Sequence, residues 1–573
     1  MVYLRASSVE QQQQCGDIQA VDNQPLDTID QRRCTNYKPN IWNYDAIQSL
    51  TSEYWGKMLV KRVEKLREDV AHLLSNAQDQ TTKLELVNWI EKLGLANLFP
   101  NEIKEALDAI ALDENQKDLP AVALRFRLLR QHGYNVPQDV FNAFMGASVG
   151  QFIDGKHVNI EGMTALLEAS HLGLESESML TDAKAFSTAH LKGIRPCVEE
   201  EQLGSSMVQE IGRALELSMH HRVQWFDVKW NISAYESEEK CNFSMLHLAK
   251  LNFNMVQATH QDNLKDMSRW WRNLGLAKSM NFTRDRLVES FLWAVGVAFE
   301  PEFGCLRKWL TKTINLVLVI DDVYDAYGSL EELESFTHAI EMWDSKEVQQ
   351  LPKCMKICFQ ALHNTIFEIA NEIQKERGGS SVLPHLKKAW RDFCMALFVE
   401  AKWYNMGYTP SLQEYLDNGW VSSCGPLLCA HALLAVIQQE DPIEDVKSIL
   451  EKNQDIVQYS SLIIRLCNDI GTSTAEAERG DAASSILCYM QEANVPEETA
   501  RKQIKEMIST TWKKINGRLM DQSSPWVQPF VRMVINMARV AHCIYQHGDG
   551  FGVQDRKTRV HVLSLLFKPL SLD

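Results

Sequence analysis

The chain has 573 residues, 45% of them hydrophobic and 23% charged, which is the composition of a globular protein and not of a disordered or fibrous one. At about 100 to 200 residues per domain, this length allows two to four domains. The formal net charge of -16 argues against a nucleic-acid partner, because binding to phosphate backbones needs a concentrated excess of lysine and arginine. An anionic ligand would have to be bound locally, by metal ions or by a few arginines.

The N-terminal segment and the cysteines bear on location. The first 30 residues are polar and lack the apolar core of a secretory signal, and they contain too few arginines for a complete transit peptide. The longest apolar runs, 314–320 and 425–437, are shorter than the roughly 20 residues that cross a bilayer, so we expect no membrane span. Thirteen cysteines occur singly, without zinc-type spacing, and indicate reduced thiols in an intracellular compartment.

Apolar residues recur at helical spacing along almost the whole chain, as in Leu59, Val63, Leu66 and Val70. Alternating strand patterns are nearly absent, which predicts an all-α fold. Further along, Thr409 can cap a helix that would begin at Pro410.

Three aspartates end the apolar run in "INLVLVIDDVYDAYG". Residues 310–327 contain neither glycine nor proline, so we expect one buried helix that places Asp321 and Asp325 one turn apart on the same face. Two such carboxylates repel each other and are costly to desolvate unless a cation lies between them. Carboxylates that leave room for water and phosphate favour Mg²⁺, whereas a solvated helix end is the alternative for this motif alone.

A second oxygen-rich set follows in "NDIGTSTAE". Asn468, Thr472 and Glu476 recur every four residues and form a stripe down one helix face. Polar stripes are usually exposed faces, but this one also follows an apolar run. Two buried helices that each end in oxygen ligands indicate a cavity with metal at its mouth.

Arginines and aromatic residues complete this set. Arg284 and Arg465 are candidates to bind a diphosphate through bidentate hydrogen bonds, and Arg286 is a further candidate. Trp293 and Tyr545 are candidates to line an apolar pocket. Each arginine could instead form an ordinary ion pair on a helix surface, and each aromatic residue could be an ordinary core residue.

With these residues in view, the chain resembles plant class I terpene synthases of the angiosperm monoterpene cyclase type, from about residue 31 to the end. The matching motifs are an arginine pair followed by eight residues and a tryptophan (Arg32, Arg33, Trp42), "RDR" (284–286), "DDVYD" (321–325) and "NDIGTSTAE" (468–476).

The resemblance implies two helical domains with the terpene synthase fold. Residues 1–34 would be a segment that caps the active site, 35–235 an N-terminal helical domain like an α-barrel, and 236–573 the catalytic α-bundle. Arg32, Arg33 and Trp42 would belong to the cap that excludes water.

The resemblance also implies the roles of the site residues. Asp321 and Asp325 would bind two Mg²⁺ ions, and Asn468, Thr472 and Glu476 a third, with Mn²⁺ as a substitute metal. The residues in contact with substrate would be Arg284, Asp321, Asp325, Arg465 and Asn468. Asp322 would support the metal cluster from behind.

Three departures from related sequences bear on the product. Ser484 stands where relatives often have a lysine that contacts diphosphate, Phe551 where some have histidine, and Ile314 where several have asparagine. Apolar side chains beside a carbocation disfavour delivery of water. We therefore expect a bicyclic hydrocarbon or bornyl diphosphate and not an alcohol.

The resulting hypothesis is a monoterpene synthase that ionises geranyl diphosphate and cyclises it through linalyl diphosphate. It would be a plastid enzyme, or otherwise a cytoplasmic one, and a monomer or homodimer. One alternative is a sesquiterpene synthase acting on farnesyl diphosphate. Another is a non-catalytic helical scaffold, for which the acidic run 331–334 would be a solvated face or a contact for a partner.

Overall fold

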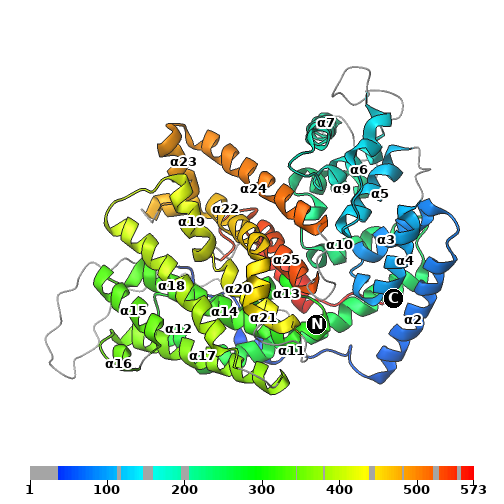
Figure 1. Cartoon of the computed structure of the whole chain (residues 1–573). Coiled ribbons are helices and arrows are strands. Elements are labelled where there is room, and N and C mark those ends of the chain that lie inside the picture. Colours follow the sequence, from blue (N-terminus) through cyan, green and yellow to red (C-terminus); the bar gives the residue numbers. More distant parts are fainter. Residues whose placement is uncertain are drawn as a thin grey trace.

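The computed structural model describes residues 37–112, 118–145, 159–194, 205–343, 345–377, 381–437, 445–479, 483–520, 528–551 and 556–572. These residues form α-helices, short 3₁₀-helices and π-helical turns joined by loops, and no strand occurs in these ranges. The predicted all-α fold is confirmed. In Figure 1 the first helices (blue to cyan) and the later ones (green to red) form two groups.

The first group precedes residue 237. Its longer helices are α2 (Lys57–Asn76), α3 (Gln80–Lys92), α4 (Pro100–Ala111), α5 (Leu119–Gln131), α6 (Ile160–Ser170), α7 (Ser178–Ile194), α9 (Ser205–Glu216) and α10 (Gln224–Glu236), preceded by the short α1 (Tyr44–Gln48). Asp79 and Asp118 cap α3 and α5 by accepting hydrogen bonds from backbone N–H groups of the first turn.

The second group contains the helices that carry the metal-ligand motifs. Its elements are α11 (Phe243–Leu274), α12 (Leu276–Ser279), α13 (Leu287–Val297), α14 (Gly304–Asp322), α15 (Leu330–Met342), α16 (Ser345–Val348), α17 (Lys353–Arg377), α18 (Leu383–Asn405), α19 (Leu412–Ser422), α20 (Gly425–Val436), α21 (Asp445–Lys452), α22 (Gln454–Arg479), α23 (Ser485–Ala493), α24 (Glu497–Met520), α25 (Gln528–Tyr545) and α26 (Arg556–Val562). Helix α11 packs against α2 and α10 of the first group and against α13 and α14 of the second. The division predicted at 235/236 falls in the last turn of α10 and stays a prediction.

Helix α14 lies in the middle of the second group because it is apolar on every side. Every residue from Trp309 to Ile320 is buried, and α14 packs against α11, α13, α17 and α20. Its buried polar side chains have partners within the helix or on neighbouring helices: the Asn315 amide donates to the Thr311 carbonyl at 2.9 Å, and Lys312 pairs with Glu368 of α17 at 3.1 Å. The buried helix delivers its C-terminal aspartates to a fixed place.

One helix start was predicted wrongly. Helix α19 begins at Leu412 and not at Pro410, and the hydroxyl of Ser411, not Thr409, accepts from the Glu414 backbone N–H at 3.2 Å. Serine and threonine are both good N-cap residues, so the pattern "TPS" leaves the choice to the surrounding loop.

Within the described ranges, one segment, Leu412–Val436, is long and apolar enough to cross a membrane, and 61% of its most apolar window is buried in the protein. It consists of two helices, α19 and α20, which are separated at Cys424, where φ is 60°. The segment is therefore a broken, largely internal pair of helices.

Candidate active site

The three aspartates lie where α14 changes into a π-helical turn, Val323–Tyr327. The Gly328 N–H donates to the Val323 carbonyl at 2.9 Å, which closes this wider turn. The single α-helix expected over 310–327 thus ends as an α-helix at Asp322, and the wider turn alters the angular offset between Asp321 and Asp325. Such π-helical turns often occur at functional sites.

The aspartates differ in exposure. The Asp322 side chain is fully buried, the Asp321 side chain is 31% exposed, and Asp325 is exposed. The two outer carboxylates can therefore reach a ligand from solvent, whereas Asp322 lies behind them.

Arg284 connects the first motif to the loop before α13. Its Nη2 lies 2.5 Å from Asp321 Oδ2, its Nε lies 2.9 Å from Asp322 Oδ1, and its backbone N–H donates to Asp322 Oδ2 at 2.7 Å. Burial raises the pKa of Asp322 to about 6, and the Arg284 charge partly offsets that rise. Arg284 therefore pairs with two of the three aspartates, while its predicted contact with substrate stays a prediction.

Arg286 does not reach the aspartates in this arrangement. It is fully buried and donates to three backbone carbonyls, those of Phe551 at 2.6 Å, Asp285 at 2.9 Å and Lys38 at 2.9 Å. The sequence analysis gave Arg286 as a further candidate to bind diphosphate. In the structure, its hydrogen bonds join the N-terminal segment to the loop after α25.

The second oxygen set lies on α22. Asn468 is half-buried, and Thr472 is 4% exposed with its hydroxyl donating to the Asn468 carbonyl at 2.9 Å. That hydrogen bond leaves lone pairs of the threonine oxygen for another partner. Glu476 continues the same helix, and its side chain lies outside the described part of the structure.

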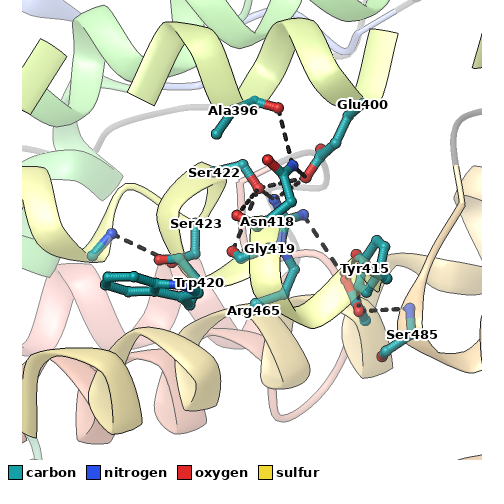
Figure 2. A network of polar contacts seen from close by, with 12 residues as sticks. Ala396, Glu400, Tyr415, Asn418, Gly419, Trp420, Ser422, Ser423, Arg465 and Ser485 are labelled. Carbon is teal, nitrogen blue, oxygen red and sulfur yellow. Dashed lines mark hydrogen bonds and ion pairs between the residues drawn. The ribbon is translucent and has the colours of Figure 1, made fainter. Parts of the chain in front are cut away.

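Arg465, one turn before Asn468, is oriented by a polar network on α18 and α19 (Figure 2). Its Nη2 donates to Ser422 Oγ at 2.6 Å and to Glu400 Oε1 at 3.2 Å, and its Nε donates to the Gly419 carbonyl at 3.3 Å. Because its side chain is only 14% exposed, this guanidinium is held in place before any ligand arrives.

Sequence analysis missed Glu400. Burial raises the pKa of this carboxyl, and Arg465 partly offsets the rise. A single acidic residue inside the apolar run "ALFVEAKWY" was the available signal, since a buried carboxylate requires a partner.

Asp469, also missed, supports Arg465 from the next position after Asn468. It is 2% exposed, accepts from the Tyr415 hydroxyl at 3.0 and 3.1 Å, and accepts from the Ser485 N–H at 2.9 Å. The Arg465 Nη1 atom lies 4.0 Å from Asp469 Oδ1. Asp469 thus links α22 to α19 and α23 beneath the predicted metal ligands.

The two motifs share one electrostatic environment. The negative charge of Asp321 contributes to raising the pKa of Glu400, after the larger effect of burial, and it also helps to raise that of Arg465. Helices α14 and α22 both contact α20, and that the two sets of oxygen ligands border one site stays a prediction.

The predicted pocket residues are mostly buried. Trp293 on α13 and Ile314 on α14 are each 4% exposed, and these two helices pack together. The rings of Tyr545 and Phe551 lie 6.4 Å apart, and the Asn468 side chain hydrogen-bonds to Tyr545. Their role in lining a substrate chamber stays a prediction.

Of the predicted cap residues, Arg32 and Arg33 lie outside the described residues. Trp42 donates from its indole N–H to Glu289 Oε1 at 2.8 Å and stacks on Phe567. Trp42 therefore lies beside α13, next to the loop that carries Arg284.

Ser484, a position singled out in the sequence analysis, caps α23 by accepting from the Leu487 N–H at 3.3 Å. It is 7% exposed. Serine is a favourable N-cap residue, so this side chain stabilises the start of α23.

The donor set suits a hard divalent cation. Carboxylates at Asp321 and Asp325 that solvent can reach, together with amide and hydroxyl oxygens on α22, are oxygen ligands of the kind Mg²⁺ prefers. The described residues contain no cluster of three or more histidine, cysteine or acidic side chains close enough to bind a metal by themselves.

Two family models match the chain. Residues 41–215 match "Terpene synthase, N-terminal domain", and residues 272–514 match "Terpene synthase family, metal binding domain". The second match spans Arg284 and both sets of predicted metal ligands.

Three relatives align over nearly the full length. An alpha-farnesene synthase from Ricinus communis is 51% identical over 95% of this chain and 97% of its own, and an (E,E)-alpha-farnesene synthase from Malus domestica is 51% identical over 95% of both. A chloroplastic geraniol synthase from Cinnamomum tenuipile is 44% identical over 95% of this chain and 89% of its own.

Two solved structures have the same fold. A limonene synthase with 2-fluorolinalyl diphosphate superimposes with a TM-score of 0.90 at 36% identity, covering 94% of this chain and 100% of that one. An isoprene synthase from grey poplar with three Mg²⁺ ions and dimethylallyl-S-thiolodiphosphate gives 0.83 at 40% identity, covering 93% and 99%.

Proposed function

Because the chain belongs to the terpene synthase family, we propose that it ionises a prenyl diphosphate where Arg284 meets Asp321 and Asp322. The observation that carries this proposal is the ion-paired cluster at the end of α14. A fully buried carboxylate holds the arginine in place, while a second carboxylate is left partly open to solvent. The arrangement suits an anion that arrives together with metal ions.

The residues that would bind Mg²⁺ are Asp321, Asp325, Asn468, Thr472 and Glu476. Three ions are proposed, the number in the isoprene synthase complex. When bound, they would draw negative charge from the diphosphate oxygens and so favour cleavage of the allylic carbon–oxygen bond.

Arginines of the chain would bind the departing diphosphate. Arg465 is already oriented by Glu400 and Ser422, so little reorganisation is needed when charge develops on the leaving group. Arg284 would exchange its contact with Asp321 for a diphosphate oxygen while Asp322 keeps hold of its Nε atom.

Apolar side chains would protect the carbocation that remains. Trp293 and Ile314 offer buried surface without a hydroxyl or amide to position water, and an aromatic face stabilises a cation through its quadrupole. We therefore propose a hydrocarbon product, formed by loss of a proton and not by capture of water.

For the substrate we propose farnesyl diphosphate. Two relatives at 51% identity over 95% of the chain are named alpha-farnesene synthases, and farnesene is a fifteen-carbon hydrocarbon. This reverses the order given by the sequence analysis, in which geranyl diphosphate was the main hypothesis and farnesyl diphosphate the alternative.

Geranyl diphosphate, with cyclisation through linalyl diphosphate, is the second candidate. The geraniol synthase relative and the limonene synthase complex with a linalyl diphosphate analogue support it.

Competition between the two diphosphates in one reaction tests the substrate assignment. Purified chain with Mg²⁺ and equal concentrations of geranyl and farnesyl diphosphate should give mainly fifteen-carbon hydrocarbons by gas chromatography. A majority of ten-carbon products would overturn the farnesyl assignment, and a majority of alcohols would overturn the hydrocarbon assignment. Absence of product from both substrates would contradict the proposed activity.

For the compartment, the cytoplasm fits the two farnesene synthase relatives, whose names carry no plastid location, and the plastid fits the geraniol synthase relative named as chloroplastic. Imaging a fluorescent fusion of the protein decides between them. The oligomeric state, monomer or homodimer, is decided by light scattering.

A further inference from the structure

Residues 37–44, which we call the strap, run along the loop before α13 and are fastened there by Asp285. This carboxylate accepts from the Asn40 amide at 3.2 Å, from the Tyr44 hydroxyl, and from the Trp271 indole at 2.9 Å. Asp285 lies between the two arginines of the "RDR" motif. It therefore fixes the strap to the loop that carries Arg284.

A second group of contacts fastens the strap over its length. The buried Arg286 donates to the Lys38 carbonyl at 2.9 Å, and Trp42 donates to Glu289 at 2.8 Å. The Trp42 ring also stacks on Phe567 with an interplanar angle of 7° and a centroid distance of 5.9 Å. Hydrogen bonds with Asp285, Arg286 and Glu289, together with the stacked Trp42 ring, hold the strap in a defined position beside α13.

The first residue of the strap reaches the site itself. The Arg284 guanidinium lies over the Tyr37 ring, 5.0 Å from its centroid, and the Tyr37 hydroxyl hydrogen-bonds to Asp322. Asp322 in turn pairs with Arg284 Nε at 2.9 Å. Tyr37 therefore contacts both members of the ion pair, from a chain segment that is remote in sequence.

We propose that Tyr37 is a positioning residue, delivered by the docked strap, which sets the orientation of Arg284 for binding diphosphate. The ring covers one face of the guanidinium, and the hydroxyl bonds to Asp322, which pairs with Nε. Together these contacts restrict rotation of the Arg284 side chain. The Nη2 atom, which pairs with the partly exposed Asp321, can exchange this partner for a diphosphate oxygen. This inference rests on the proposed function of the same site.

The geometry supports this role because the Tyr37 ring and the Asp322 carboxylate both contact Arg284 before any ligand binds. A cation over an aromatic face is held more strongly the less it is exposed to water. The Arg284 side chain is only 11% exposed, which favours a strong contact with the ring. An arginine held in advance loses less conformational freedom when the anion binds.

Binding of inorganic pyrophosphate in the presence of Mg²⁺, measured by calorimetry, tests the proposal without turnover. Tyr37→Ala should weaken binding about tenfold, and Tyr37→Phe, which keeps the ring, about threefold. Tyr408→Phe is the matched control, because that exposed hydroxyl donates to Glu414 on the surface, and it should bind like the wild type. Wild-type affinity in both Tyr37 variants would overturn the proposal.

A double-mutant cycle tests whether the strap acts through Tyr37. Tyr44→Phe removes the hydroxyl that donates to Asp285, and within the described residues Tyr44 is not among the contacts of Arg284. It should weaken pyrophosphate binding severalfold in the wild-type background and have almost no further effect beside Tyr37→Ala. Equal weakening in both backgrounds would contradict delivery by the strap.

The kinetics separate this inference from the proposed function. Tyr37→Phe should raise KM for the prenyl diphosphate more than it lowers kcat, and it should melt within a few degrees of the wild type. If the wild type turns over no prenyl diphosphate, the proposed function fails, while the pyrophosphate titrations still decide the role of Tyr37.

Discussion

Four histidines, two of them buried and two half-buried, lie between the two groups of helices and predict a loss of stability in mild acid. His171 follows α6, His220 and His221 end the 3₁₀-helix at 219–221, and His542 lies on α25. The His221 ring stacks on Trp512 of α24 at 4.4 Å. Burial is the main cause that lowers the pKa of each, to about 3 for His220 and about 4 for His542.

Hydrogen bonds define which ring nitrogen carries the proton in two of these histidines. The Trp512 indole N–H donates to His542 Nε2 at 2.8 Å, so this nitrogen is the acceptor and a proton added there would displace the bond. His220 Nε2 donates to Asn516 Oδ1 at 2.8 Å, because the Asn516 amide already donates to two backbone carbonyls. The neighbouring Arg539 further disfavours a charge on His220.

The direction and size of this change in stability follow from the linkage between protonation and folding. A histidine with a folded-state pKa below its unfolded value contributes stability above about pH 6.5, and this stability is lost as pH falls towards the folded pKa. Between pH 7 and pH 5, each fully shifted histidine costs about 1.9 kcal/mol, so His220 and His542 together cost about 4 kcal/mol. That is a large part of a typical folding free energy of about 5 to 15 kcal/mol.

Urea unfolding followed by circular dichroism at pH 7 and pH 5 measures this loss. The wild type should lose about 4 kcal/mol or more, and His220→Gln with His542→Gln should lose about 4 kcal/mol less than the wild type over the same interval. His338→Gln is the control, since that side chain is 53% exposed, and it should leave the pH dependence unchanged. Equal pH dependence in the wild type and the double variant would refute this reasoning.

Two substitutions test the packing of the fold by urea unfolding. Gly425→Ala should cost about 1 to 3 kcal/mol, because the added Cβ would lie 2.1 Å from Ser461 Oγ and 3.0 Å from its Cα, and an unchanged midpoint would contradict this close approach. Arg130→Met should cost about 3 to 5 kcal/mol, because it leaves the buried Glu177 carboxylate without its partner at 2.5 Å, and a loss below about 1 kcal/mol would show that the pair contributes little.

Local patterns were enough to predict the fold class and the first metal-ligand motif. Uniform hydrophobicity from residue 310 onwards predicts a buried helix, and Asp321 and Asp325 fall at its end as expected. The π-helical turn was not predicted, because the choice between an α- and a π-helical turn depends on packing around the helix end.

Residues whose roles depend on tertiary contacts could not be assigned in the same way. Arg286 has the same local sequence context as Arg284, yet it is buried against three carbonyls. Glu400 and Tyr37 are 65 and 247 residues away from their arginine partners, Arg465 and Arg284, so no spacing rule brings them together.

The central claim, metal-dependent ionisation at the end of α14, is tested most directly by the release of inorganic pyrophosphate from farnesyl diphosphate. The wild type should release it with Mg²⁺ and stop when EDTA is added, Asp321→Asn should be slower by about 10² to 10³ in kcat, and the exposed Asp417→Asn should match the wild type. Release by Asp321→Asn at the wild-type rate, or release unaffected by EDTA, would contradict the account.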